Sequence, residues 1–109
     1  MIRRILVATD RSDRATRAVS WAAEMSEKYG ADLLVLQVIA PEHLPGSDTV
    51  DAGAAEGQLA ALTRELCGDR GRPLVVYDSD PGGAIVRTCA EQDVDLVVMA
   101  ARDALRMCG

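Results

Sequence analysis

The sequence lacks the features that mark a disulfide scaffold, a membrane protein or a nucleic-acid-binding protein. Its three cysteines, Cys67, Cys89 and Cys108, have no paired or CxxC spacing, which is typical of reduced thiols rather than of a disulfide or zinc framework. No apolar run approaches the roughly 20 residues that a membrane-spanning helix needs. Only 12 basic residues oppose 17 acidic ones, and the net charge of −5 disfavours binding to a phosphate backbone.

Signals for export and for catalysis are also missing. The amino terminus leads directly into the first apolar segment without a signal-peptide region, so we expect a cytoplasmic protein. His43 is the only histidine and lies in a segment with prolines and glycines, where we expect a solvated loop residue rather than a metal ligand. Because the chain has one histidine and no Ser or Cys in a strained elbow context, a Ser-His-Asp or Cys-His hydrolase is unsupported, and we expect no enzyme.

The chain does contain a strict alternation of strand patterns and amphipathic helix patterns. Strands are predicted at 5–8, 32–39, 74–77 and 95–100. The helices between them are expected to begin after Ser12 or Asp13, near Ala55 and at Pro81, and segment 41–53 is expected to be irregular. At 109 residues, this alternation predicts one domain, 1–109, of the α/β class with an open, doubly wound parallel sheet.

The carboxyl end of the first strand is the place to look for function. The apolar run Ile5–Ala8 ends in Thr9 and Asp10, and a helix start follows at once. Open α/β sheets bind ligands at the carboxyl ends of their strands, which makes Asp10 a candidate ligand contact. An equally open interpretation is that the Asp10 side chain only caps the turn between strand and helix.

Three segments, 5–12, 30–38 and 80–99, together resemble the universal stress protein family. They read ILVATDRS, GADLLVLQV and a stretch that opens with Asp-Pro and closes with VDLVVM. The resemblance implies a sheet of order 3-2-1-4, usually completed by a fifth strand, in a dimer that takes part in stress adaptation. Many members bind ATP or AMP, and the resemblance assigns nucleotide contacts to Thr9, Asp10, Val38, Met99 and, at the start of the phosphate segment, Ala100.

The phosphate segment departs from the family pattern. The resemblance implies that nucleotide-binding members carry a pattern of glycine, two residues, glycine, nine residues, glycine and a small hydroxylated residue. In this chain, Ala100 and Asp103 stand at the first two glycine positions. Alanine keeps backbone N–H groups farther from a phosphate, and Asp103 adds a negative charge. The chain ends before the third position. We therefore expect weak or impaired ATP or AMP binding, in a carboxyl-terminally truncated domain or a fragment of a longer ATP-binding protein.

The usual fifth strand is expected to be missing for the same reason. The strand at 95–100 would then leave a bare apolar edge, which native proteins avoid. We expect either a partner chain or a helical turn formed by 101–107 to cover this edge.

Other functions fail at single positions. A haloacid-dehalogenase-type phosphatase needs a carboxylate where Ser12 stands, and a receiver domain needs a phosphoacceptor where Ala100 stands. The pair Gly82-Gly83 lacks the lysine of a phosphate loop and indicates a tight helix start close to a neighbouring strand. Two functions remain: a dimeric stress-response regulatory domain with weak adenine-nucleotide binding, and a dimerisation or interaction module that binds no nucleotide.

Overall fold

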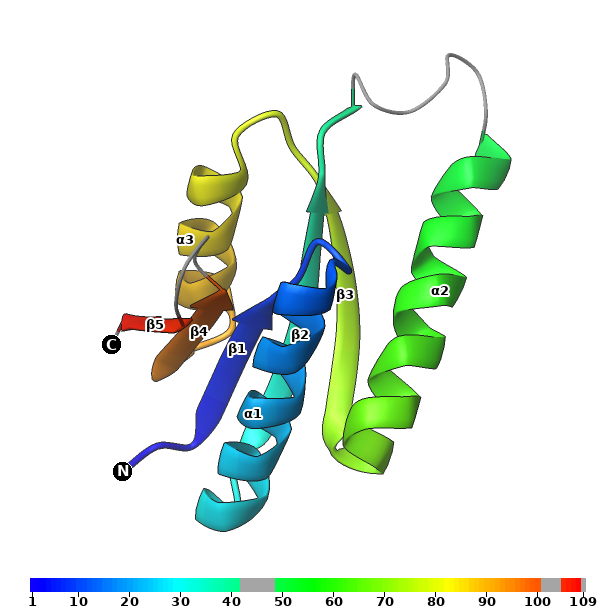
Figure 1. Ribbon diagram of the computed structural model, residues 1–109. Helices are drawn as coiled ribbons and strands as arrows, with labels where there is room; N and C mark the ends of the chain where they lie inside the picture. Colours follow the sequence, from blue (N-terminus) through cyan, green and yellow to red (C-terminus); the bar gives the residue numbers. More distant parts are fainter. Residues whose placement is uncertain (42–48, 101–104, 109) are drawn as a thin grey trace.

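Strands and helices alternate along the chain until the last strand, as Figure 1 shows for the computed structural model. The structure describes residues 1–41, 49–100 and 105–108, and for 49–52 and 105–108 it describes the backbone alone. The elements are β1 (Arg4–Ala8), α1 (Asp13–Tyr29), β2 (Asp32–Ile39), α2 (Thr49–Cys67), the 3-10 turn η2 (Gly68–Arg70), β3 (Gly71–Tyr77), α3 (Pro81–Glu91), β4 (Leu96–Ala100) and β5 (Leu105–Cys108).

The sheet has the order β3-β2-β1-β4-β5, and its first four strands are parallel. The strand β1 is central, with Ile5 opposite Leu33 of β2 on one side and Leu96 of β4 on the other. This arrangement confirms the α/β class and the order 3-2-1-4. It also brings the carboxyl ends of β1, β2 and β4 to one edge of the sheet.

The expectation that the fifth strand is missing is wrong. Leu105–Cys108 pairs antiparallel with β4, with Val98 opposite Met107 and Ala100 opposite Leu105. The edge of β4 is thus covered by a strand of the same chain, and the helical turn expected over 101–107 is not formed at 105–107; residues 101–104 lie outside the described part. Edge pairing satisfies backbone groups of β4 that a helical turn would leave open.

Helices cover both faces of the sheet, as a doubly wound fold requires. One core cluster joins Ile5 and Val7 to Val19 of α1 and Leu59 of α2, so α1 and α2 share a face. The other cluster joins Leu6, Leu34 and Leu36 to side chains of α3, including Ile85 and Cys89. In Figure 1, α1 lies in front of the sheet. No helix in the described part is long and apolar enough to cross a membrane.

Capping residues set both ends of α1 and the start of α3. The Ser12 hydroxyl accepts the Ala15 N–H at 3.2 Å, and Gly30 closes α1 with a left-handed φ of 63°. At the start of α3, the Asp80 carboxylate accepts the Gly83 N–H at 3.2 Å. A β-carbon at Gly83 would collide with that carboxylate, so the crowding there comes from the cap itself and not from the neighbouring strand expected from the sequence.

Two helices differ in detail from the prediction. Tyr29 of α1 follows the helical spacing of Ala22 and Met25 but is 48% exposed, while Ser26 is buried and donates its hydroxyl to the Ala31 carbonyl at 2.8 Å. The helix α2 begins at Thr49, inside the segment expected to be irregular, and it therefore includes Gly53 and Gly57, which disfavour a helix by local propensity. The remainder of that segment, 42–48, lies outside the described residues.

The inner face of α2 includes a polar residue. Ala55 and Leu59 are buried, and the next buried residue along the helix is Thr63, whereas Leu62 is only partly buried. Its hydroxyl donates to the Leu59 carbonyl at 2.7 Å, which satisfies the polar group inside the core. The chain then passes so close to Thr63 that a β-carbon at Gly71 would clash with its methyl group. Glycine is therefore needed at position 71, where β3 begins.

Candidate functional site

A pocket of about 300 Å³ opens at the carboxyl edge of the sheet. It lies where β1, β2 and β4 end and where α1 and α3 begin. All five residues predicted as nucleotide contacts line it: Thr9 and Asp10 after β1, Val38 in β2, and Met99 and Ala100 in β4. The structure therefore brings together side chains that lie up to 91 positions apart in the sequence, from Thr9 to Ala100. Such a volume lies at the small end of ligand pockets, which begin at roughly 300 Å³.

The turn between β1 and α1 holds the polar side of the pocket in place. The Thr9 N–H donates to the Leu36 carbonyl at 2.8 Å, which extends the pairing of β1 with β2 by one residue. The Thr9 hydroxyl accepts the Arg11 N–H at 2.9 Å, and Arg11 has a left-handed φ of 66°. For a residue other than glycine this conformation is uncommon and costs free energy. The turn is thus a strained but tightly bonded link.

Asp10 both caps this turn and faces the pocket. Its Oδ1 accepts the Ser12 N–H at 2.9 Å, which is the capping role that the sequence left open. The pKa of Asp10 lies below its ordinary value of 3.8, because the Ser12 side chain and then the Ser12 backbone N–H hydrogen-bond to the charged form; partial burial opposes this, and Arg14 adds attraction. Asp10 is therefore a carboxylate at neutral pH, with acceptor capacity left for a ligand.

The walls of the pocket are mainly apolar. Val38 and Met99 stand at the ends of β2 and β4, and Ile85 and Pro81 come from the first turns of α3. The sequence pattern marks Pro81 only as the start of a helix. The position of Pro81 and Ile85 at the pocket follows from the topology, because in a parallel sheet each helix begins above the carboxyl edge. A flat apolar group could lie between these walls with its polar atoms directed to Asp10 and Thr9.

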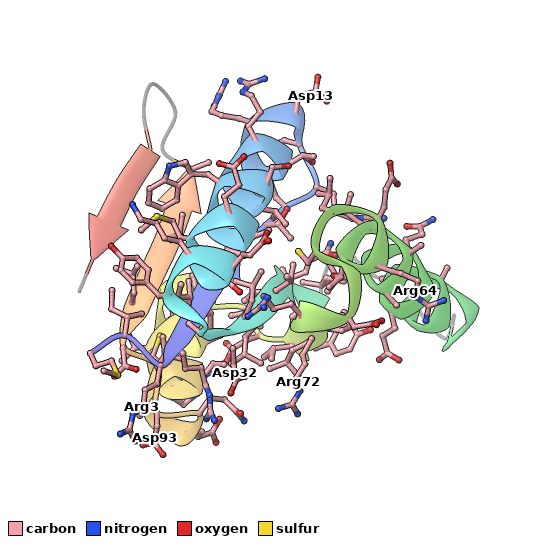
Figure 2. All side chains as sticks on the ribbon, turned by 90° about the horizontal axis from the view of Figure 1, so that it is seen from below. Arg3, Asp13, Asp32, Arg64, Arg72 and Asp93 are labelled. Atoms are coloured by element: carbon pink, nitrogen blue, oxygen red, sulfur yellow. The ribbon has the colours of Figure 1, made fainter. Side chains whose placement is uncertain are left out.

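Arg14 is the lining residue that the sequence analysis missed. A charged residue on a surface helix is typical of a solvated face, yet Arg14 lines the pocket while it remains exposed. The signal was its place in the first turn of α1, directly after the strand end that carries Asp10. Asp13, the neighbouring carboxylate of that turn, points away from the body of the protein in Figure 2.

The described residues that line the pocket include no His, Cys or Lys. Across the described part of the chain, no group of three or more His, Cys, Asp or Glu side chains could hold a metal ion. His43 lies outside that part. Cys67 and Cys89 are free and half-buried, and burial raises the pKa of both thiols. The pocket therefore offers a carboxylate, hydroxyls, a guanidinium and an apolar slot, which are binding groups.

Comparisons with known proteins show which family this fold belongs to. The closely matching solved structures include a protein of the universal stress protein family from Burkholderia pseudomallei, with 30% identity over 92% of this chain and 82% of that chain and a TM-score of 0.72. The universal stress protein from Archaeoglobus fulgidus matches with 25% identity over 94% of this chain and 78% of its own, at a TM-score of 0.71. No curated protein sequence is similar enough to count as a relative.

A universal stress protein from Archaeoglobus fulgidus in complex with dAMP is also similar, with 26% identity, coverage of 91% of this chain and 82% of that chain, and a TM-score of 0.68. The model of the universal stress protein family matches residues 1–107, which is nearly the whole chain. This chain belongs to the universal stress protein family.

Proposed function

We propose that this protein is a non-catalytic, cytoplasmic stress-response regulator that works as a homodimer and binds an adenine nucleotide weakly in the pocket at the carboxyl edge of its sheet. One observation carries the proposal: the five residues predicted as nucleotide contacts, drawn from three separate strand ends, line a single pocket. The dAMP complex of the similar Archaeoglobus fulgidus protein supports an adenine nucleotide as the ligand class.

Each lining residue has a role in this proposal. Val38 and Met99 sandwich the adenine ring, for which their apolar side chains provide contact area. Asp10 and Thr9 accept hydrogen bonds from the ribose hydroxyls or the amino group of the base. Because Asp10 is already held by Ser12, its carboxylate is oriented before the ligand arrives, which lowers the entropic cost of binding.

Weak binding follows from the phosphate side of the pocket. Ala100 stands where the pattern of nucleotide-binding members has glycine. Its methyl group keeps a phosphate from close contact with the backbone at that position. Asp103, the second substituted position, lies outside the described residues. Alanine in place of glycine at position 100 favours the second candidate function, an interaction module without nucleotide binding. Calorimetry separates this function from weak nucleotide binding.

Isothermal titration with adenosine, AMP and ATP tests the proposal. We expect millimolar or tighter binding by the wild type, and Asp10→Ala to weaken it by at least about tenfold, the equivalent of one hydrogen bond to a charged group. Asp10→Asn keeps an acceptor for the Ser12 N–H but lacks the charge, so it separates loss of the turn from loss of the ligand contact. Asp69→Ala, an exposed carboxylate remote from the pocket, is the matched control. No binding by the wild type would favour the interaction module.

A further inference from the structure

Arg14 adds a positive charge to the pocket, in addition to the negative charge of Asp10. It lines the pocket together with Asp10, and its charge contributes to the lowered pKa of that carboxyl group. The two side chains nevertheless form no salt bridge, since the only ion pairs in the described structure join Arg4 to Asp32 and Arg87 to Asp78. The pocket thus presents a carboxylate and a guanidinium at two separate points.

The Arg14 guanidinium has no partner among the described residues, in contrast to nearby cations. Arg11, in the same turn, donates to Gln58 of α2, and Arg87 of α3 pairs with Asp78. Arg14 makes neither a hydrogen bond nor an ion pair in the described part of the chain. No described residue occupies any of its five N–H donors, which have the planar arrangement that matches two oxygens of a phosphate.

We propose that Arg14 binds the phosphate of a nucleoside monophosphate, so that the pocket prefers such a ligand over the uncharged nucleoside. This inference rests on the proposed function and names the ligand class of the same pocket. Asp10 accepts hydrogen bonds from the nucleoside, Val38 and Met99 hold the base, and Arg14 neutralises the anionic end. A guanidinium on the rim replaces contact with the backbone at Ala100, where the methyl group stands.

One phosphate suits the pocket better than three. Arg14 is the only cationic side chain among the described residues that line it. A second and a third phosphate would bring further negative charge toward Asp10, which is ionised at neutral pH. The pocket's volume of about 300 Å³ is also at the small end of the range for ligand sites. ATP should therefore bind no more tightly than AMP.

The test compares adenosine, AMP and ATP by isothermal titration at low salt with the wild type, Arg14→Gln and Arg17→Gln. Arg17 is the matched control, because it is exposed on the same helix, has no partner in the described structure and does not line the pocket. We expect the wild type to bind AMP about tenfold more tightly than adenosine, as one charge-assisted contact implies. Arg14→Gln should lose the preference and bind AMP and adenosine about equally, and Arg17→Gln should match the wild type.

Salt gives an independent readout. Because the Arg14 guanidinium is exposed, the preference of the wild type for AMP should shrink as salt rises, and the adenosine affinity should not. Thermal unfolding checks that the variants are folded.

The outcomes separate this inference from the proposed function. If the wild type binds both adenosine and AMP, but Arg14→Gln keeps the same preference between them or weakens both equally, the role of Arg14 is wrong and nucleotide binding stands. ATP binding much more tightly than AMP would overturn the monophosphate preference. If the wild type binds none of the three ligands, the proposed function fails and this inference fails with it.

Discussion

At the scale of single residues, the turn after β1 combines two tasks that the sequence left as alternatives. Asp10 accepts the Ser12 N–H, so it caps the turn, and it also lines the pocket. The capping role is observed, and the ligand contact remains a prediction. Local pattern could identify the residue because a carboxylate after a buried strand is informative in either role. It could not place Arg14 at the pocket, since a charged residue in a first helical turn looks the same in sequence whether or not a pocket lies beside it.

The two glycines at the start of α3 give a prediction at this scale. A β-carbon at Gly83 would collide with the Asp80 carboxylate, whereas one at Gly82 would come no closer to it than 3.9 Å. We expect Gly83→Ala to displace the carboxylate and lose the helix cap, which costs about 1 kcal/mol. Gly82→Ala should instead stabilise the protein by about 0.5 to 1 kcal/mol, because alanine restricts the unfolded chain.

Urea unfolding of the two glycine variants measures this difference. Alanine also improves helix propensity at position 83, so the lost cap is partly offset there. The informative quantity is the gap of about 1 kcal/mol between the two variants. Equal stabilisation by both substitutions would show that the Asp80 cap contributes little.

At the scale of elements, the sequence predicted the limits of those helices and strands whose ends are set by nearby residues. The strand β2 and the helix α1 have the expected limits, since Ser12 and Gly30 stand at the two ends of the helix. The limits of β3 and the existence of β5 depend instead on partners far away in the sequence. Pairing with β2 extends β3 back to Gly71, and pairing with β4 turns Leu105–Cys108 into a strand. Neither effect can be read from a short window.

The junction between β1 and β4 gives a second prediction. One oxygen of Asp95 accepts the N–H groups of Arg3 and Arg4, at 2.8 and 3.1 Å, just before the two strands run side by side. These two hydrogen bonds, of which the one from Arg3 has the larger effect, hold the pKa of Asp95 below its ordinary value of 3.8. A folded-state pKa below the unfolded one means that the stabilisation is present above pH 3.8 and is lost as pH falls through the lowered value.

We therefore expect Asp95→Asn to be less stable than the wild type at pH 7 and to approach it in acid, below about pH 4. Asp69→Asn, at an exposed carboxylate without a hydrogen bond or ion pair in the described structure, should follow the wild-type profile. Thermal midpoints measured from pH 7 to pH 2 make the comparison. A constant offset between Asp95→Asn and the wild type across this range would contradict the assignment.

At the scale of the whole molecule, the oligomeric state is the open prediction. The structure is that of one chain, with a Cα radius of gyration of 13.4 Å, close to the value expected for a compact domain of its length. The outer edge of β5 has no partner strand in the described part of the chain, and edges of this kind favour association. We expect light scattering after size exclusion to give twice the 11.6 kDa of one chain. A mass of one chain at all concentrations would show that it acts as a monomer.

The central position of β1 has a consequence for how the protein is made. This strand is synthesised well before β4, one of its two neighbours in the sheet, because β4 begins 92 positions later in the chain, at Leu96 rather than Arg4. Until β4 has been made, one side of the apolar segment Ile5–Val7, which is buried in the folded protein, lacks its neighbouring strand. The pocket at the carboxyl edge, which needs both β1 and β4, therefore cannot form before β4 has been synthesised.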